Sequence, residues 1–189
     1  MLVDRARILV DRDRIRLRVA ELGASIARDL SAVGDDEQVL FMPVMTGAMF
    51  FAADLIRHVH RKVRIGIVTA SSYPGRATRS TGEPTISGLA EDLHGRHVVI
   101  IDDILDSGRT ISRLRELVRE RGAGSVRSCV LLRKPAAAAA RTECEYVGFE
   151  IPDEFVVGYG LDYDGYYRNL PDICVLDPAR AISAGACGA

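Results

Sequence analysis

Two acidic residues, Asp102 and Asp103, follow directly after the strongly apolar segment 98–101 (Val-Val-Ile-Ile). An apolar run of this kind is typical of a strand that is buried on both faces of a sheet. Ligands of open α/β sheets bind beyond the carboxyl ends of the strands. The sequence therefore predicts that both carboxylates lie at a ligand-binding site.

The residues that follow, 106–110 (Asp-Ser-Gly-Arg-Thr), have the composition of a phosphate-binding turn. They would offer backbone N–H groups and hydroxyls at the start of a helix, where anions bind. Helix capping would explain one polar residue, but not two acids at the end of a buried strand, where unpaired charge is costly. The segment lacks the P-loop pattern GxxxxGK followed by Ser or Thr. A ribose and a Mg²⁺ ion between the phosphate and the acids would account for the whole pattern.

The composition predicts a single domain over residues 1–189, which is long enough to bury a core of its own. The net charge of −1 argues against a nucleic-acid partner. We expect no membrane partner and a cytoplasmic location, because the chain shows no signal peptide and no apolar run of membrane-spanning length. The cysteines show no CxxC spacing, and Cys129 and Cys174 lie in apolar runs, which predicts buried thiols and neither a disulfide framework nor a zinc site.

Strand and helix patterns alternate along most of the chain. We expect helices from Asp11 or Asp13 to Leu30, over 48–60 and over 110–121. Expected strands cover 8–10, 39–44, 63–72, 85–89, 98–101, 128–132, 146–149, 155–157 and 173–176. The alternation predicts an α/β fold with a mainly parallel core sheet flanked by helices. The long polar stretch 73–84 is expected to be a mobile functional loop, and the small residues of 181–189 a frayed tail.

The segment from Asp102 to Thr110 resembles the phosphoribosyl-pyrophosphate (PRPP) motif of type I phosphoribosyltransferases. Residues 131–134 (Leu-Leu-Arg-Lys) are similar to the family's base-selecting lysine segment. Residues 147–163 and 167–171 are similar to a signature of hypoxanthine-guanine phosphoribosyltransferases. The resemblance implies the type I fold, with a small hood built from the chain ends. It also implies purine salvage, in which PRPP and hypoxanthine or guanine give IMP or GMP and pyrophosphate with Mg²⁺ as cofactor.

The resemblance also implies roles for the residues at the end of the apolar strand. Asp102 and Asp103 would face the ribose hydroxyls and their metal ion. Asp106 would accept a proton from purine N7 or hold it in a hydrogen bond, which makes it the expected catalytic base. The turn that binds the 5′-phosphate would use the backbone and side chains of Asp106, Ser107, Gly108, Arg109 and Thr110. Arg109 stands where the family often has lysine, so the cation is retained.

On the base side, the resemblance implies that Lys134 donates a hydrogen bond to purine O6 and so selects a carbonyl over an amino group. Phe155 would stack on the base, and Val156 would contact it through backbone groups. Asp162 would bind a second metal ion near the purine edge. Arg168 would hold pyrophosphate through its guanidinium group.

Two further segments resemble loops of the family. Met45, Thr46 and Gly47 are similar to its pyrophosphate loop, which implies a cis peptide bond before Thr46. Many members have lysine in place of Thr46, so here the loop loses a cation. Ser72 and Tyr73 are similar to part of the flexible loop that closes over the reacting atoms and excludes water.

Two alternative functions remain open from the sequence. A xanthine-preferring enzyme is the first, because Lys134 alone does not separate the three oxopurines. The second is a nucleotide-sensing regulator on the same fold that binds nucleic acid through a basic N-terminal stretch (Arg5, Arg7, Arg12, Arg14, Arg16, Arg18). Retention of Asp106, Lys134 and Asp162 favours the enzyme. Family resemblance also implies a homodimer or homotetramer, with the helix at 48–59 as a candidate interface.

Overall fold

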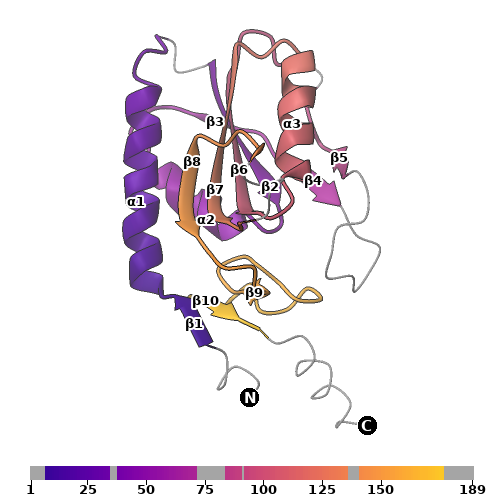
Figure 1. The fold of residues 1–189 in the computed structure, drawn as a ribbon. Helices are drawn as coiled ribbons and strands as arrows, with labels where there is room; N and C mark the ends of the chain where they lie inside the picture. Colours follow the sequence, from indigo (N-terminus) through magenta and orange to yellow (C-terminus); the bar gives the residue numbers. More distant parts are fainter. Residues whose placement is uncertain (1–6, 35–37, 72–83, 91, 136–140, 177–189) are drawn as a thin grey trace.

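The computed structural model describes residues 7–34, 38–71, 84–90, 92–135 and 141–176. A twisted central sheet stands between helices, and a smaller sheet lies at one end of it (Figure 1). The central sheet has seven strands in the order β5-β4-β2-β6-β7-β8, with β3 also paired to β2. All of its pairs are parallel except β4 with β5. The predicted mainly parallel α/β sheet is confirmed.

The helices and strands of the described residues have the following bounds. The helices are α1 (Arg12–Asp29), α2 (Met49–Arg57) and α3 (Arg109–Glu120). The strands of the central sheet are β2 (Val39–Met45), β3 (Arg64–Ile65), β4 (Val68–Ser71), β5 (Thr85–Ser87), β6 (His97–Leu105), β7 (Ser125–Arg133) and β8 (Tyr146–Glu150). The smaller sheet consists of β1 (Arg7–Val10), β9 (Val156–Val157) and β10 (Ile173–Val175).

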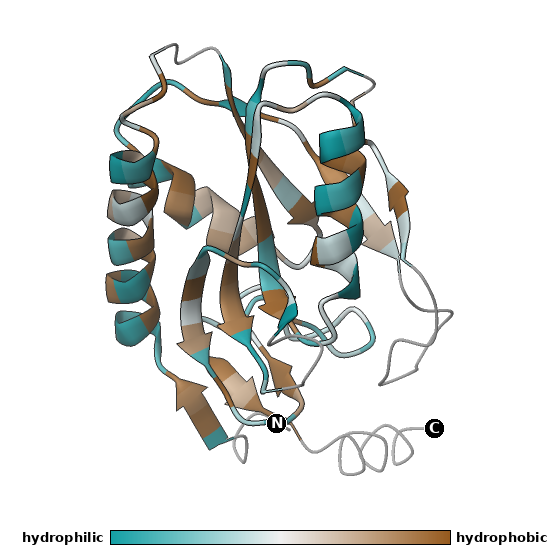
Figure 2. Cartoon of the chain, turned by 45° about the horizontal axis from the view of Figure 1, so that its top comes forward, coloured by the Kyte–Doolittle hydropathy of each residue, from teal (hydrophilic) through white to brown (hydrophobic). Residues whose placement is uncertain are grey.

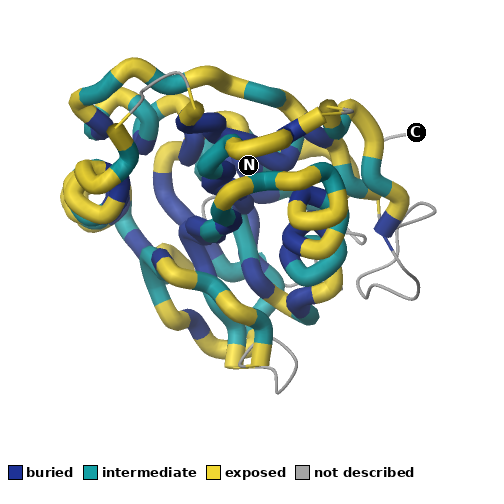
Figure 3. The backbone as a smooth tube through the Cα atoms, turned by 90° about the horizontal axis from the view of Figure 1, so that it is seen from above, coloured by how far each residue is buried: buried dark blue, intermediate teal, exposed yellow. Residues whose placement is uncertain are grey.

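The core consists of two layers, one on each face of the central sheet. Strand side chains alternate between the layers, so Phe41 and Ile101 face α1 and α2 whereas Met42 and Ile100 face α3. Both faces of β2 and β6 are therefore buried, which explains their continuous apolar sequences. Apolar colour is concentrated in these strands (Figure 2), and the buried positions gather between the helices (Figure 3).

The strand order reverses between β2 and β6, and this reversal opens the site. From β2 the chain continues through α2 to β3 and β4 on one side, and from β6 it continues through α3 to β7 on the other. The β2–β6 ladder ends at the pair Pro43 and Ile101, whereas β6 stays paired with β7 as far as Leu105. A crevice between strand ends at such a reversal is the usual ligand site of an open α/β sheet.

The hood consists of the smaller sheet (β1, β9 and β10) and the segment 158–172 that connects β9 to β10. It joins the two ends of the described chain. β10 pairs antiparallel with both β1 and β9, as the expected hood requires. Asp172 ties this sheet to α1, because its carboxylate accepts hydrogen bonds from the Arg12 backbone at 2.9 Å and from the Arg12 Nη2 at 2.8 Å. These hydrogen bonds hold the pKa of Asp172 below its ordinary value. At the same end of α1, Asp11 is the N-cap and accepts from Asp13 N and Arg14 N.

Several expected element boundaries were wrong; the strand expected over 128–132, for example, begins earlier and is β7 (Ser125–Arg133). The strand expected over 63–72 is interrupted after Ile65, although β3 and β4 keep the same register against β2 on both sides of Gly66. The helix expected over 48–60 ends at Arg57, with His58 as its C-cap. The strand expected over 98–101 continues through Asp102 and Asp103 to Leu105, because the β7 ladder extends beyond the apolar run. Residues 72–83, 136–140 and 177–189, which include most of the expected mobile loop and the tail, lie outside the described residues.

Arg115 of α3 is buried against the sheet with carboxylate partners. Its guanidinium donates to both oxygens of Glu145, at 2.8 and 2.9 Å, and to the Ser128 hydroxyl at 3.0 Å. Burial alone would raise the pKa of Glu145, but the hydrogen bonds from Arg115 and from Ser128 N lower it. The pair therefore stabilises the fold above the unfolded-state pKa of Glu145, and that contribution is lost as pH falls through the lower folded-state pKa.

We expect Glu145→Gln to lower the free energy of unfolding at pH 7 by about 1–3 kcal/mol, because the buried Arg115 guanidinium loses one of its two carboxylate partners and retains only Glu143 at 2.6 Å. Urea unfolding of wild type and variant from pH 7 to pH 3 would measure this. The difference should shrink below pH 4.5, the unfolded value for glutamate. Glu116→Gln on the same helix removes an exposed pair with Arg113 and should cost less than about 1 kcal/mol. Equal effects of the two variants would contradict this account.

Candidate active site

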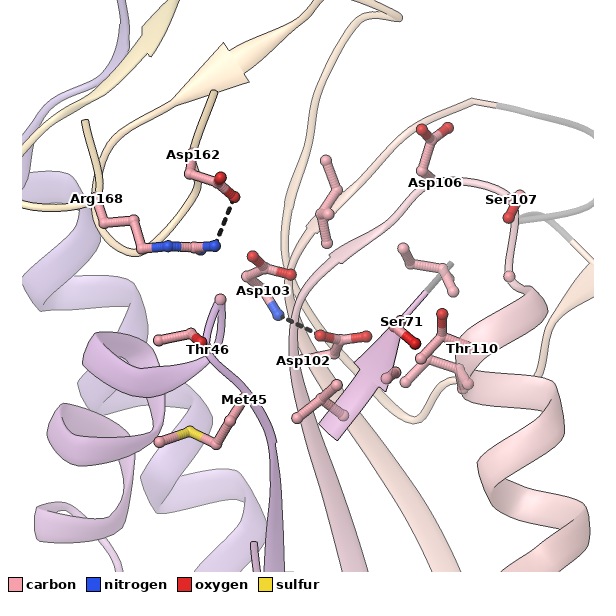
Figure 4. Close-up of a pocket in the computed structure, with 17 residues that line it drawn as sticks. Met45, Thr46, Ser71, Asp102, Asp103, Asp106, Ser107, Thr110, Asp162 and Arg168 are labelled. Atoms are coloured by element: carbon pink, nitrogen blue, oxygen red, sulfur yellow. Dashed lines mark hydrogen bonds and ion pairs between the residues drawn. The ribbon is translucent and has the colours of Figure 1, made fainter. Parts of the chain in front are cut away.

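A cavity of about 350 Å³ opens at the strand reversal, between the carboxyl ends of β2 and β6 (Figure 4). Its walls come from the β2–α2 turn, the end of β4, the end of β6, the β6–α3 turn and the segment that precedes β10. Most of the site residues expected from the sequence line it: Thr46, Gly47, Asp102, Asp103, Asp106, Ser107, Gly108, Thr110, Asp162 and Arg168. Tertiary structure thus brings together residues that are more than 100 positions apart in the chain.

Asp102 and Asp103 form the acidic floor of the cavity. Asp102 is only 6% exposed, and its Oδ1 accepts the backbone N–H of Asp103 at 3.0 Å. Burial raises the pKa of Asp102 well above its ordinary value, and the charge of Asp103 raises it further. Burial also raises the pKa of Asp103, whereas the positive charge of Arg168 opposes this shift. Because both pKa values are raised, the two carboxyl groups favour binding of a proton or of another positive charge.

The donor set fits a magnesium ion that is shared with a substrate. Within the described residues, no group of three or more His, Cys, Asp or Glu side chains is arranged to hold a metal by itself. Mg²⁺ commonly takes one or two protein carboxylates and completes its shell with substrate oxygens and water. Asp102 and Asp103 provide such a partial set of hard oxygen ligands.

The β2–α2 turn approaches the acidic floor so closely that only glycine fits. A Cβ atom on Gly47 would lie 2.0 Å from the Asp103 Oδ2. The peptide bond between Met45 and Thr46 is cis, as the family resemblance implied. From the other side, a Cβ on Gly160 would lie 2.2 Å from the Gly47 carbonyl oxygen, and Gly160 has a φ of +104°. The turn is therefore held between β6 and the hood.

The β6–α3 turn presents the start of α3 to the cavity. Gly108 is the N-cap of α3 and has a φ of 78°, a left-handed conformation that glycine adopts without strain. The first N–H groups of a helix have no partner within it, so they are available to an anion. The hydroxyl residues Ser107 and Thr110 border the same space (Figure 4). Arg109 is the first residue of α3, but it is exposed and lies outside the cavity lining.

The hood contributes an ion pair to the opposite wall. Arg168 Nη2 lies 2.7 Å from Asp162 Oδ1, and Arg168 Nη1 also donates to the Gly160 carbonyl (Figure 4). The Tyr159 hydroxyl donates to Asp54 Oδ2 of α2 at 2.6 Å, which fixes this segment against the helix. The guanidinium of Arg168 thereby faces the acidic floor from across the cavity.

Of the expected base-binding residues, Asp162 lines this cavity, whereas Lys134, Phe155 and Val156 lie outside its lining. Lys134 follows β7, and its side chain is only 11% exposed. Phe155 and Tyr163 pack edge to face, with ring centroids 5.7 Å apart. Val156 is buried in β9. Lys134 is nevertheless linked to the cavity, because its Nζ lies 3.6 Å from Asp106 Oδ2.

Two residues near the site escaped the sequence reasoning. Ser71, the last residue of β4, lines the cavity. Asp153 lies 3.2 Å from Lys134 Nζ, and only its position in the 147–163 signature could have pointed to it. The expected loop residues Ser72 and Tyr73 lie outside the described residues.

The fold and site define a class of protein. The chain belongs to the phosphoribosyl transferase domain family, whose model matches residues 9–164. Among curated proteins it is 44% identical over 175 residues to the hypoxanthine-guanine phosphoribosyltransferase of Mycobacterium tuberculosis H37Rv, covering 90% of this chain and 86% of the relative. It is also 44% identical over 177 residues to the Bacillus subtilis enzyme of the same name, covering 93% and 96%. Within the family, the chain is one of the hypoxanthine-guanine phosphoribosyltransferases.

Solved structures agree with this assignment. A hypoxanthine phosphoribosyltransferase from Staphylococcus aureus superposes with a TM-score of 0.81 at 38% identity, covering 92% of each chain. The Trypanosoma cruzi hypoxanthine phosphoribosyl transferase superposes with a TM-score of 0.84 at 33% identity, covering 96% of each. In the part of the chain that the structure describes, no helix is both long and apolar enough to cross a membrane.

We expect Gly47→Ala to displace the Asp103 carboxylate, because the added methyl group would occupy the position of its Oδ2. A crystal structure of the variant should show Asp103 in another rotamer or the turn moved away from β6. Gly34→Ala is a matched control, since a Cβ there meets nothing within 4 Å. An unchanged Asp103 and an unchanged turn in Gly47→Ala would show that the close approach does not hold.

Proposed function

We propose that this protein transfers the phosphoribosyl group of PRPP to hypoxanthine or guanine, giving IMP or GMP and pyrophosphate in purine salvage. One observation carries the proposal: a desolvated acidic pair and the open start of a helix border the same cavity. This arrangement suits a ligand with a phosphate at one end and a sugar carrying hydroxyls and developing positive charge at the other.

The protein's main contribution is to hold the sugar. The first N–H groups of α3, with the hydroxyls of Ser107 and Thr110, would bind the 5′-phosphate. Asp102 and Asp103 would then lie beside the ribose, where their negative charge stabilises the oxocarbenium-like transition state as the pyrophosphate leaves. Thr46, Gly47 and Arg168 would border the leaving pyrophosphate, and the guanidinium matches the geometry of phosphate oxygens.

Asp102, Asp103 and, from the hood, Asp162 are the residues that would hold Mg²⁺. The bound ion would neutralise pyrophosphate and ribose oxygens as a Lewis acid. Asp162 is paired with Arg168 in the present structure. Its carboxylate can therefore serve a cation on the same wall of the cavity once Arg168 binds phosphate.

The base would bind between the end of β7 and the hood. Phe155 would stack on the ring, and Val156 would contact it through its backbone. Lys134 would donate to O6, whereas a 6-amino purine would present a donor to the ammonium group. Asp106, the first residue of the phosphate turn and 3.6 Å from Lys134 Nζ, would accept the N7 proton.

Three of the N-terminal arginines form contacts within the protein, which disfavours the nucleic-acid-binding alternative. Arg7 pairs with Glu154 and Arg12 with Asp172. Arg18 donates to the carbonyl oxygens of β8 at 2.8 and 2.9 Å. Tight, salt-resistant retention of RNA or DNA in filter binding would favour that alternative.

We also propose a cytoplasmic location and a homodimer or homotetramer. The cysteines in the described ranges are free thiols, which suits a reducing compartment. Met49 and Phe50 at the start of α2 are exposed beside a cavity of about 670 Å³ between α1, α2 and the hood. Exposed apolar side chains at a concave surface are typical of an interface.

A PRPP-dependent assay with Mg²⁺ over adenine, hypoxanthine, guanine and xanthine tests the proposed function. We expect turnover of hypoxanthine and guanine and little of adenine. Lys134→Ala should raise KM for hypoxanthine by about 10–100-fold, the cost of one charged hydrogen bond, and should reduce discrimination against adenine. Preferential turnover of xanthine would support the first alternative, and absence of turnover with every base would contradict the enzyme.

We expect Asp106→Asn to lower kcat by about 100-fold or more and to change KM for either substrate by much less, because a general base acts mainly in the transition state. Steady-state kinetics with hypoxanthine and PRPP would measure both. Asp164→Asn is a suitable control, since Asp164 is an exposed hood residue outside the cavity lining. Near-normal turnover in Asp106→Asn would remove the proton-accepting role.

A further inference from the structure

Three neighbouring parallel strands end side by side next to the site. The registers pair Leu105 of β6 with Arg133 of β7, and Arg133 with Glu150 of β8. Lys134 N donates to the Leu105 carbonyl at 3.0 Å, and Ile151 N donates to the Arg133 carbonyl at 2.9 Å. The residues that directly follow β6, β7 and β8 are thus held next to one another by backbone hydrogen bonds.

This alignment places one ammonium group between two carboxylates. Lys134 Nζ lies 3.2 Å from Asp153 Oδ1 and 3.6 Å from Asp106 Oδ2. The shorter contact is to Asp153, in the segment after β8, and the longer one, to Asp106, exceeds ordinary hydrogen-bond length. A largely buried ammonium requires a charged or polar partner. Asp153 is the closer of the two.

The proposed reaction places different requirements on Asp106 and Asp153. Asp106 must remain available to the purine, so its pairing with Lys134 would compete with base binding. A direct Lys134–Asp106 ion pair would also occupy the ammonium that O6 requires. Asp153 is not part of the cavity lining, and the proposed reaction assigns it no contact with the purine.

We propose that Asp153 is a positioning residue for purine recognition, which draws the Lys134 ammonium away from Asp106 and holds it ready for the 6-oxo group. This inference rests on the proposed function. Without Asp153, Lys134 would close onto Asp106, and the base would have to break that ion pair in order to bind.

The next residue along the chain provides a matched control. Glu154 pairs with Arg7 of β1, and its carboxylate therefore serves the hood and not Lys134. A hydrogen bond of 2.8 Å from Glu154 N to the Pro152 carbonyl forms the turn that separates the two acids. Arg133 and Glu150, the last residues of β7 and β8, pair with one another.

The test is the steady-state kinetics of Asp153→Asn in the full chain. We expect KM for hypoxanthine to rise by about 3–10-fold, with kcat and KM for PRPP changed by less than about 2-fold. Asp153→Glu should recover part of the loss, because it retains the charge. Glu154→Gln should match the wild type. In a Lys134→Ala background, Asp153→Asn should change KM for hypoxanthine by less than about 2-fold, since the coupled partner is absent.

The kinetic results distinguish failure of the positioning role of Asp153 from failure of the proposed function. If the wild type is active and Asp153→Asn has the wild-type KM for hypoxanthine, the positioning role is wrong and the proposed function stands. The role is also wrong if the same rise in KM occurs in the Lys134→Ala background, or if KM for PRPP rises equally. A wild type that turns over no purine would overturn the proposed function, and the inference with it.

Discussion

The arrangement of the site follows from one energetic cost, which is the removal from water of two adjacent carboxylates, Asp102 and Asp103, at the end of a buried strand. Two like charges in a poorly hydrated position are unfavourable unless opposite charge is supplied. The chain supplies part of it through Arg168, across the cavity from Asp103. The negative charge that remains uncompensated is the feature on which the proposed binding of a metal ion and of a cationic transition state rests.

This constraint explains the close packing around the acidic floor. β6 is extended past its apolar run by pairing with β7, so the carboxylates are held on a rigid strand. Gly47 allows the β2–α2 turn to pass over Asp103, and Gly160 allows the hood to pass over Gly47. A side chain at Gly160 would push the hood away from the backbone of the β2–α2 turn, and one at Gly47 would displace either the Asp103 carboxylate or the turn.

The hood is the second requirement, because Asp162 and Arg168, which close one wall of the cavity, come from it. It is assembled from the beginning and the end of the described chain and is fastened at two places. Asp172 binds Arg12 at the start of α1, and Tyr159 binds Asp54 on α2. The arginine-rich N-terminal sequence, which looked like a basic binding arm, is partly explained by this fastening and by the bonds of Arg18 to β8.

The sequence by itself determined the order and type of the elements, the mainly parallel sheet, and the position of the acidic pair and the turn 106–110 at the end of a buried strand. Apolar periodicity and the residues at strand ends are local properties, so they can be read without coordinates. Local patterns missed the extension of β6, the break between β3 and β4 and the early end of α2, because ladder partners and packing set these limits. Only the tertiary structure decided that Lys134 lies between Asp106 and Asp153, since the registers of β6 with β7 and of β7 with β8 must both be right to bring them together. It also decided that Gly47 and Gly160 are steric requirements, because each is defined by a backbone or side chain distant in sequence.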